Sequence, residues 1–118
     1  MKNKIFLFIS LVTLISIISS CQKLDLEVDV PNCIEKRIKK FKKADVQNPP
    51  AKVWKWEVDD QTYYYIPSDC CDQFHYLYDS KCNEVCAPDG GIAGWGDGNC
   101  PEFSGTIEWT LVWEDDRK

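Results

Sequence analysis

The apolar and polar residues of this chain follow two different periods. In residues 32–43 the apolar side chains recur at helical spacing and share one face: Ile34, Ile38 and Phe41. Asn32 is placed to cap this helix, and Glu35 follows three residues later, as in a capping box. The Asn-Pro-Pro run at residues 48–50 cannot continue a helix. The pattern therefore predicts one amphipathic helix.

From Lys52 the period changes to two, which is typical of strands with one buried face. We expect strands at Lys52 to Val58, Thr62 to Ile66, Phe74 to Tyr78, Asn83 to Ala87 and Thr106 to Glu114, with a turn at Asp59-Asp60-Gln61. The predicted fold class is α+β, with one helix packed on a four- to five-stranded antiparallel sheet. Four tryptophans are expected to supply much of the buried surface: Trp54, Trp56, Trp109 and Trp113.

The N-terminus has the pattern of an export signal. Two lysines precede an apolar run of about 14 residues, which is short for a membrane span and fits a signal-peptide core. Ile18-Ser19-Ser20-Cys21 is similar to the bacterial lipobox, so we expect lipidation at Cys21 after cleavage. This gives a signal peptide at residues 1–20, a tether at 21–31 and a domain at 32–118. The mature protein is then expected in the cell envelope, and Gln22 is compatible with the outer membrane.

Residues 22–30 alternate apolar and acidic side chains, which fits either a tether or an edge strand. The full chain of 118 residues is long enough for one domain, and its net charge of -5 argues against a nucleic-acid partner. The predicted helix at residues 32–43 is locally basic, with six positive side chains: Lys36, Arg37, Lys39, Lys40, Lys42 and Lys43. These can rest on anionic lipid headgroups or form an ordinary solvated face.

Seven cysteines in a chain of this size point to an oxidising compartment and to disulfide stapling. If Cys21 carries lipid, six remain for three disulfides: Cys33, Cys70, Cys71, Cys82, Cys86 and Cys100. Because neighbouring side chains diverge in extended backbone, Cys70 and Cys71 are expected to bridge two different elements, one of them reaching Cys33. Cys86 is expected to pair with Cys100. The spacings do not favour a zinc knuckle or a redox Cys-x-x-Cys motif.

Few residues suggest catalysis, and we expect neither an enzyme nor a bound cofactor or metal. His75 is the one histidine, and no serine sits in a nucleophile motif beside it. The glycine-rich segment 88–101 is a structural loop, a calcium loop using Asp89, Asp97 and Asn99, or a partner-binding loop. In the last case its contact residues would be Asp89, Gly90, Gly91, Trp95 and Asp97. The five tyrosines at 63–65, 76 and 78 either line a glycan or peptide platform or, as is commoner for tyrosines in strands, pack half-buried on the sheet.

Several stretches together resemble a family of small exported bacterial lipoproteins whose domain has no assigned function. They are Ile66 to Phe74 with its Cys-Cys-Asp element, Leu77-Tyr78-Asp79, Cys86 to Gly91 with Pro-Asp-Gly-Gly, and Gly96 to Pro101. The resemblance covers roughly residues 33–103 and implies no activity. We therefore expect a membrane-anchored, non-catalytic binding or structural module with a protein or glycan partner. Alternatives are an inhibitor-like module presenting the Cys86–Cys100 loop to an enzyme, and a small metal-binding protein.

Overall fold

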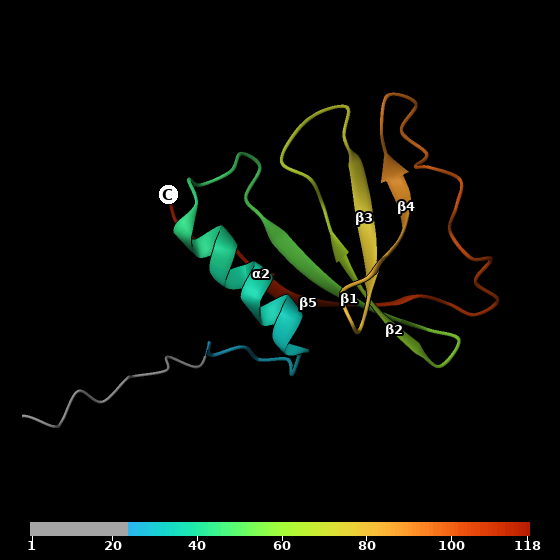
Figure 1. Ribbon diagram of the computed structural model, residues 1–118, viewed down its shortest axis with the longest axis horizontal. Coiled ribbons are helices and arrows are strands. Elements are labelled where there is room, and N and C mark those ends of the chain that lie inside the picture. The colour runs from blue at the N-terminus through green and yellow to red at the C-terminus, as the bar shows by residue number, and fades with distance from the viewer. Residues whose placement is uncertain (1–23) are drawn as a thin grey trace, which may run out of the picture.

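The computed structural model describes residues 24–118, in which one helix packs on a five-stranded antiparallel sheet (Figure 1). The helix is α2 (Asn32–Lys43), and the strands are β1 (Lys52–Val58), β2 (Gln61–Ile66), β3 (Phe74–Asp79), β4 (Glu84–Gly90) and β5 (Glu108–Glu114). Their order in the sheet is β4-β3-β2-β1-β5. The predicted helix and antiparallel sheet are confirmed, with β4 extending further into the glycine-rich segment than expected. The signal peptide at 1–20 and Cys21 lie outside the described residues.

Helix α2 covers one face of the sheet and buries its apolar stripe there. Ile34 and Ile38 are fully buried and pack with residues from four strands: Val53, Tyr64, Ile66, Tyr78 and Val112. The guanidinium of Arg37 lies 4.0 Å above the ring centre of Tyr78, a cation–π contact at the edge of this cluster. The helical period of the sequence thus reports the buried face correctly.

The predicted cap of α2 is wrong. Pro31 is the N-cap residue and makes no side-chain cap, while Asn32 is already helical and lacks the extended backbone of a capping residue. The Pro31 carbonyl instead accepts the amides of Ile34 and Glu35. Glu35 does not close a capping box: its carboxylate pairs with Lys39 at 2.9 Å and accepts the Leu24 amide at 3.4 Å.

The C-terminus closes the other end of α2, and Figure 1 shows it beside the last helical turn. The Arg117 guanidinium donates to the carbonyls of Phe41, Lys42 and Ala44 at 2.9–3.0 Å. It also makes two hydrogen bonds to the buried carboxylate of Asp115. Since the last carbonyls of a helix have no intrahelical partner, this arginine caps the helix and ties it to the end of β5.

The opposite face of the sheet is partly covered by the crossover from β4 to β5. These strands are the two edges of the sheet, and α2 already occupies one face, so residues 91–107 pass over the other. Cys100, Phe103 and Ile107 pack there on a second cluster formed by Trp56, Tyr65, Leu77 and Cys86. The Asp59 carboxylate fixes the crossover by accepting hydrogen bonds from the Ser104 amide and hydroxyl and from the Gly105 amide.

The expectation that four tryptophans supply much of the buried surface is met only in part, because Trp109 is half exposed and the four rings are divided between the two faces of the sheet. The pairing of β1 with β5 is interrupted between Val53 and Trp54 by a β-bulge, and both Val112 and Trp113 contact the helix-side cluster. Trp113 stacks on Phe41 of the helix at 6.0 Å between ring centroids. Trp56 is buried on the opposite face, whereas Trp109 is half exposed there.

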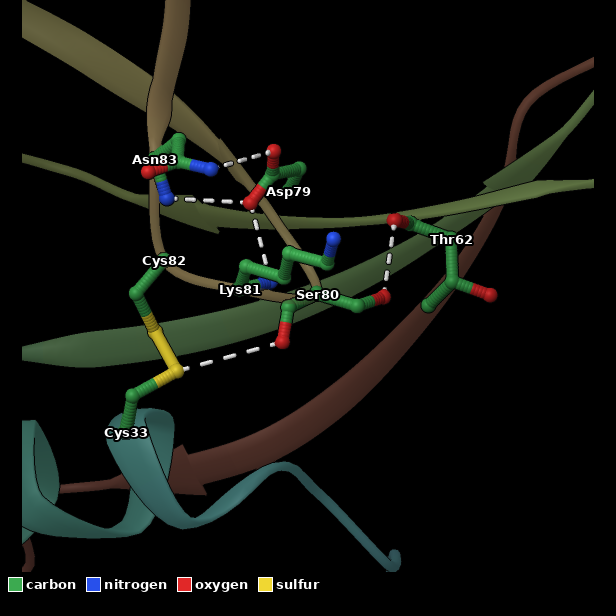
Figure 2. Close-up of a disulfide and its surroundings, with 7 residues drawn as sticks. All are labelled: Cys33, Thr62, Asp79, Ser80, Lys81, Cys82 and Asn83. Carbon is green, nitrogen blue, oxygen red and sulfur yellow. Dashed lines mark hydrogen bonds between the residues drawn. A yellow bond between two sulfur atoms is a disulfide. The ribbon is translucent and has the colours of Figure 1, made fainter.

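The structure has three disulfides, and one of the expected pairings is confirmed: Cys86 joins Cys100. Cys33 joins Cys82, which links the start of α2 to the β3–β4 turn (Figure 2). The prediction that Cys70 and Cys71 bridge to two different elements is wrong, because they bond to each other. Cys71 has a positive φ of 40°, so this segment is a turn and lacks the extended backbone on which that prediction relied.

Asp79 organises the β3–β4 turn around the Cys33–Cys82 bond. Its carboxylate accepts the amides of Lys81 and Asn83, each at 2.9 Å, and the Asn83 side-chain amide at 3.1 Å (Figure 2). Cys82 takes a positive φ of 62° in this turn. The turn is therefore held by side-chain hydrogen bonds as well as by the disulfide.

Residues 24–31 form no strand, although their side chains alternate between half-buried and exposed. Four apolar residues of this segment pack against the helix-side cluster: Leu24, Leu26, Val28 and Val30. The alternation that suggested an edge strand therefore reflects packing without strand pairing. Among residues 24–118, no helix has the length and apolarity needed to cross a membrane.

Candidate functional site

An aromatic cluster on the helix-free face reaches solvent at Trp109. The Trp109 ring lies 4.4 Å from the ring of Trp56, 5.9 Å from that of Trp54 and 5.6 Å from that of Tyr65, between centroids. Trp109 is nevertheless 50% exposed, and Leu111 on the same edge strand is 40% exposed. The crossover covers only part of this face, so an indole ring is held rigidly by its neighbours and still meets water.

Beneath Trp109, the indole N–H of Trp56 is buried and has no hydrogen-bond acceptor among residues 24–118. Buried donors normally find a partner, so an unpaired one at the base of an exposed aromatic cluster is unusual. Its neighbour Tyr65 stacks on it at 5.2 Å and links the aromatic cluster to polar groups.

The polar groups come from three adjacent strands. The Tyr65 hydroxyl on β2 donates to the Asp89 carboxylate on β4, at 2.8 and 2.9 Å from its two oxygens. It also lies 3.2 Å from Nδ1 of His75 on β3. His75 and Asp89 are cross-strand partners in the sheet, which is why they meet. We call Tyr65, His75 and Asp89 the polar cluster.

Proton positions in the polar cluster follow from donor counting. The single hydroxyl proton of Tyr65 goes to Asp89, so a hydrogen bond between the tyrosine oxygen and Nδ1 of His75 requires the imidazole tautomer that carries its proton on Nδ1. Burial and the hydrogen bond to Asp89 raise the pKa of Tyr65 well above its usual value, so the hydroxyl remains a donor. Half of the Asp89 side chain is exposed, which leaves carboxylate surface free for a ligand hydroxyl or amide.

The glycine-rich segment does not form one site. Asp89 and Gly90 belong to β4, and Asp89 joins the polar cluster. Asp97 is a turn residue whose carboxylate accepts the Asn99 amide, while its own amide bonds to the Ala87 carbonyl. The loop is held close to β4 at Gly96, where φ is +80° and an added Cβ would overlap the Ala87 carbonyl.

At the outer end of that loop, Ile92 and Trp95 are 92% and 79% exposed. The expected contact residue Trp95 is thus accessible, and Gly91 is fixed next to it through a hydrogen bond to the Gln73 carbonyl. Of the three residues considered for calcium, Asp97 and Asn99 lie together because the Asp97 carboxylate accepts the Asn99 amide, whereas the Asp89 carboxylate is bonded to Tyr65. No group of three or more His, Cys, Asp or Glu side chains that could hold a metal ion occurs among residues 24–118.

The five tyrosines form no exposed platform and pack on the sheet, which is the other of the two alternatives. Tyr64, Tyr65 and Tyr78 are buried, and Tyr63 and Tyr76 are half-buried. Alternation predicted a buried position for Trp109, which is instead half exposed. His75 lies on strand β3, and its contact with the Tyr65 hydroxyl places it in a hydrogen-bonded cluster that no local pattern indicates.

The fold and this face define a small disulfide-linked α+β domain in which a tryptophan cluster adjoins a Tyr-His-Asp group. The chain belongs to the family described as Domain of unknown function (DUF6970), whose model matches residues 39–115. The match includes all five strands, and with them Trp109 and the polar cluster. The expectation of a family without an assigned function is confirmed. No curated protein and no solved structure matches the chain.

Proposed function

We propose that this chain is a lipid-anchored lipoprotein of the cell envelope whose domain is a non-catalytic binding module, and that it binds its ligand on the helix-free face. The observation that carries the proposal is the half-exposed Trp109, held in place by three other aromatic rings. Well-packed aromatic residues that still contact water are typical of recognition surfaces. The lipobox-like run ending at Cys21 supports the anchor.

The chemistry of the face favours a glycan over a protein partner. The apolar face of a sugar ring can lie flat on an indole, while its hydroxyls need acceptors and donors nearby. Trp109 supplies the flat surface, and Asp89 and His75 supply an exposed carboxylate and an imidazole across the Tyr65 ring. The net charge of -5 disfavours polyanionic ligands.

Site-specific cross-linking in intact cells tests the binding face. A photoreactive amino acid replaces Leu111, two residues from Trp109 on β5, in one variant and Trp95 in a matched control, because both positions are exposed but lie on different segments. The proposal expects a glycan-containing adduct from position 111, which disappears when Asp89→Asn or Trp109→Ala is added. Adducts from position 95 alone, or from neither position, would refute it.

The anchor has its own test. The intact mass of the mature protein is expected to include acyl chains on Cys21, and Cys21→Ala should release the protein from the membrane fraction. Several acyl chains anchor stably, whereas one alone binds only marginally. A mature chain without acyl mass would refute the lipoprotein assignment and leave the binding face untested by that result.

A second candidate is an inhibitor-like module that presents the Cys86–Cys100 loop to an enzyme. The specific observation is the exposure of Ile92 and Trp95 on a loop closed by a disulfide. A loop fixed in its bound shape loses little entropy on binding. Mixing the protein with envelope hydrolases should then lower their activity, and Trp95→Ala should abolish the inhibition while Trp109→Ala should not.

A further inference from the structure

We infer that the outward face of α2 docks on an anionic phospholipid bilayer and so fixes the orientation of the domain. The inference rests on the proposed lipid anchor for its location, and on charge complementarity for its partner. Lys36, Lys40 and Lys43 form what we call the lysine stripe, one residue after another at spacings of four and three. All three are exposed, on the side of the helix away from buried Ile34 and Ile38.

The lysine stripe is not neutralised by the rest of the helix. Glu35 is the one acidic residue of α2, and it pairs with Lys39. Within residues 24–118, no ion pair is recorded for the stripe, whereas Lys52 and Lys55 of β1 pair with Glu114 and Glu57. The helix carries six positive and one negative side chain, while residues 44–118 carry five positive and fifteen negative.

The acidic residues before the helix lie on a different flank. Asp25 lines a surface hollow with Lys42 and Trp113, and Glu27 and Asp29 line another with Glu35. Because Glu35 and Lys42 lie on one side of the helix, away from the lysine stripe, the acidic residues that line hollows with them lie on that flank. The outward surface of α2 is therefore cationic by itself.

The point of attachment brings this surface close to the membrane. Leu24 already packs on the helix-side cluster, and its amide lies 3.4 Å from Glu35. Three Cα–Cα steps separate it from Cys21, and they span at most ~11 Å. This is close to the Debye length at physiological salt, which is the distance over which an anionic surface attracts cationic side chains. The helix thus stays near the headgroups whenever Cys21 is anchored.

Docking would make the binding face accessible. Figure 1 shows α2 on one side of the sheet, and Trp109 lies on the helix-free side. When the lysine stripe faces the bilayer, the sheet separates the aromatic cluster from the headgroups. The expected gain in association is about fivefold for each lysine near an anionic leaflet, or about 100-fold for three.

The test measures energy transfer from the tryptophans to dansyl-labelled lipid. The purified full-length mature protein is added to vesicles of phosphatidylcholine alone or with 30% phosphatidylglycerol. We expect higher transfer with phosphatidylglycerol and its loss in about 0.5 M salt. The variant K36E/K40E/K43E should stay at the phosphatidylcholine level. The control K52E/K55E/K81E has the same net charge and should behave like the wild type.

Equal transfer on both vesicles, or equal loss in the stripe and control variants, would overturn the inference. Binding of the stripe to an acidic protein in place of lipid would also give equal transfer on both vesicles. The acyl mass of the same preparation is recorded first, so an unlipidated chain refutes the anchor independently. Such a chain still reports on the stripe, because transfer is measured in either case.

Discussion

Removing the Cys33–Cys82 disulfide should lower the free energy of unfolding substantially, because this bond closes a long loop of the chain. The bond joins residues 49 apart and connects α2 to the sheet. In the chain-entropy model, a loop of this length costs the cross-linked unfolded chain about 14 cal/mol/K, or about 4 kcal/mol at 25 °C. That is a large part of the 5–15 kcal/mol by which a typical domain is stable.

The vicinal disulfide supplies a matched control. Cys70 and Cys71 are adjacent and exposed, so their bond closes no chain loop and should contribute almost nothing by this mechanism. Both double-alanine variants are unfolded in urea and followed by tryptophan fluorescence, which reports on the buried Trp56. With a slope of about 2 kcal/mol/M, the Cys33/Cys82 variant should unfold at about 2 M lower urea. The Cys70/Cys71 variant should stay near the wild-type midpoint.

Tryptic digestion without reduction checks the pairing on which this reasoning depends. The peptide 56–81 contains both Cys70 and Cys71 and should be released alone, lighter by two hydrogens than its reduced form. Peptide 24–36 should remain joined to peptide 82–117 through Cys33. If 56–81 were joined to either of them, or if both double variants lost equal stability, the entropy argument would be refuted.

Three further outcomes are expected. Ile38→Ala, at a position with no exposure, should lower the unfolding free energy by about 2–5 kcal/mol in the same urea assay. Hydrogen bonds from the Ser104 amide and hydroxyl lower the pKa of Asp59 in the folded protein. The ionised carboxylate therefore stabilises the fold above the usual aspartate pKa, and this stabilisation is lost as the pH falls through the pKa of the folded protein. Asp59→Asn, which tolerates the same positive φ, should therefore show a smaller loss of unfolding midpoint between pH 7 and pH 3 than the wild type; an equal loss would exclude Asp59 as a source. Trp109→Ala should change the unfolding free energy by less than the Ile38 variant, and an equal loss would mean that Trp109 is a core residue.

Local patterns predicted the elements well. The helical period placed Ile34 and Ile38 on the buried face, and the period of two found all five strands with small errors at their ends. These signals are local, because each element must present its apolar side chains to one side. The N-cap prediction was wrong for a local reason as well, since Pro31 occupies the N-cap position that was predicted for Asn32.

Long-range arrangement limited the prediction of the candidate site. Nothing local in the sequence shows that Tyr65, His75 and Asp89 meet, because this depends on the register of three strands. Nor does alternation show that Trp109 is half exposed, which depends on the edge position of β5 and on where the crossover runs. The bulge in β5 likewise places Trp113 on the helix side of the sheet, opposite to the face that alternation with Trp109 indicates.

By itself, the sequence determined the helix, the strands, the surplus of cysteines and the basic surface of α2, since composition and periodicity are properties of neighbouring residues. Tertiary structure alone decided that Cys33 pairs with Cys82, which aromatic rings meet water and which polar groups touch. Those outcomes depend on distances between segments far apart in the chain, and such distances exist only after the sheet has formed and its two faces have been covered by different parts of the protein.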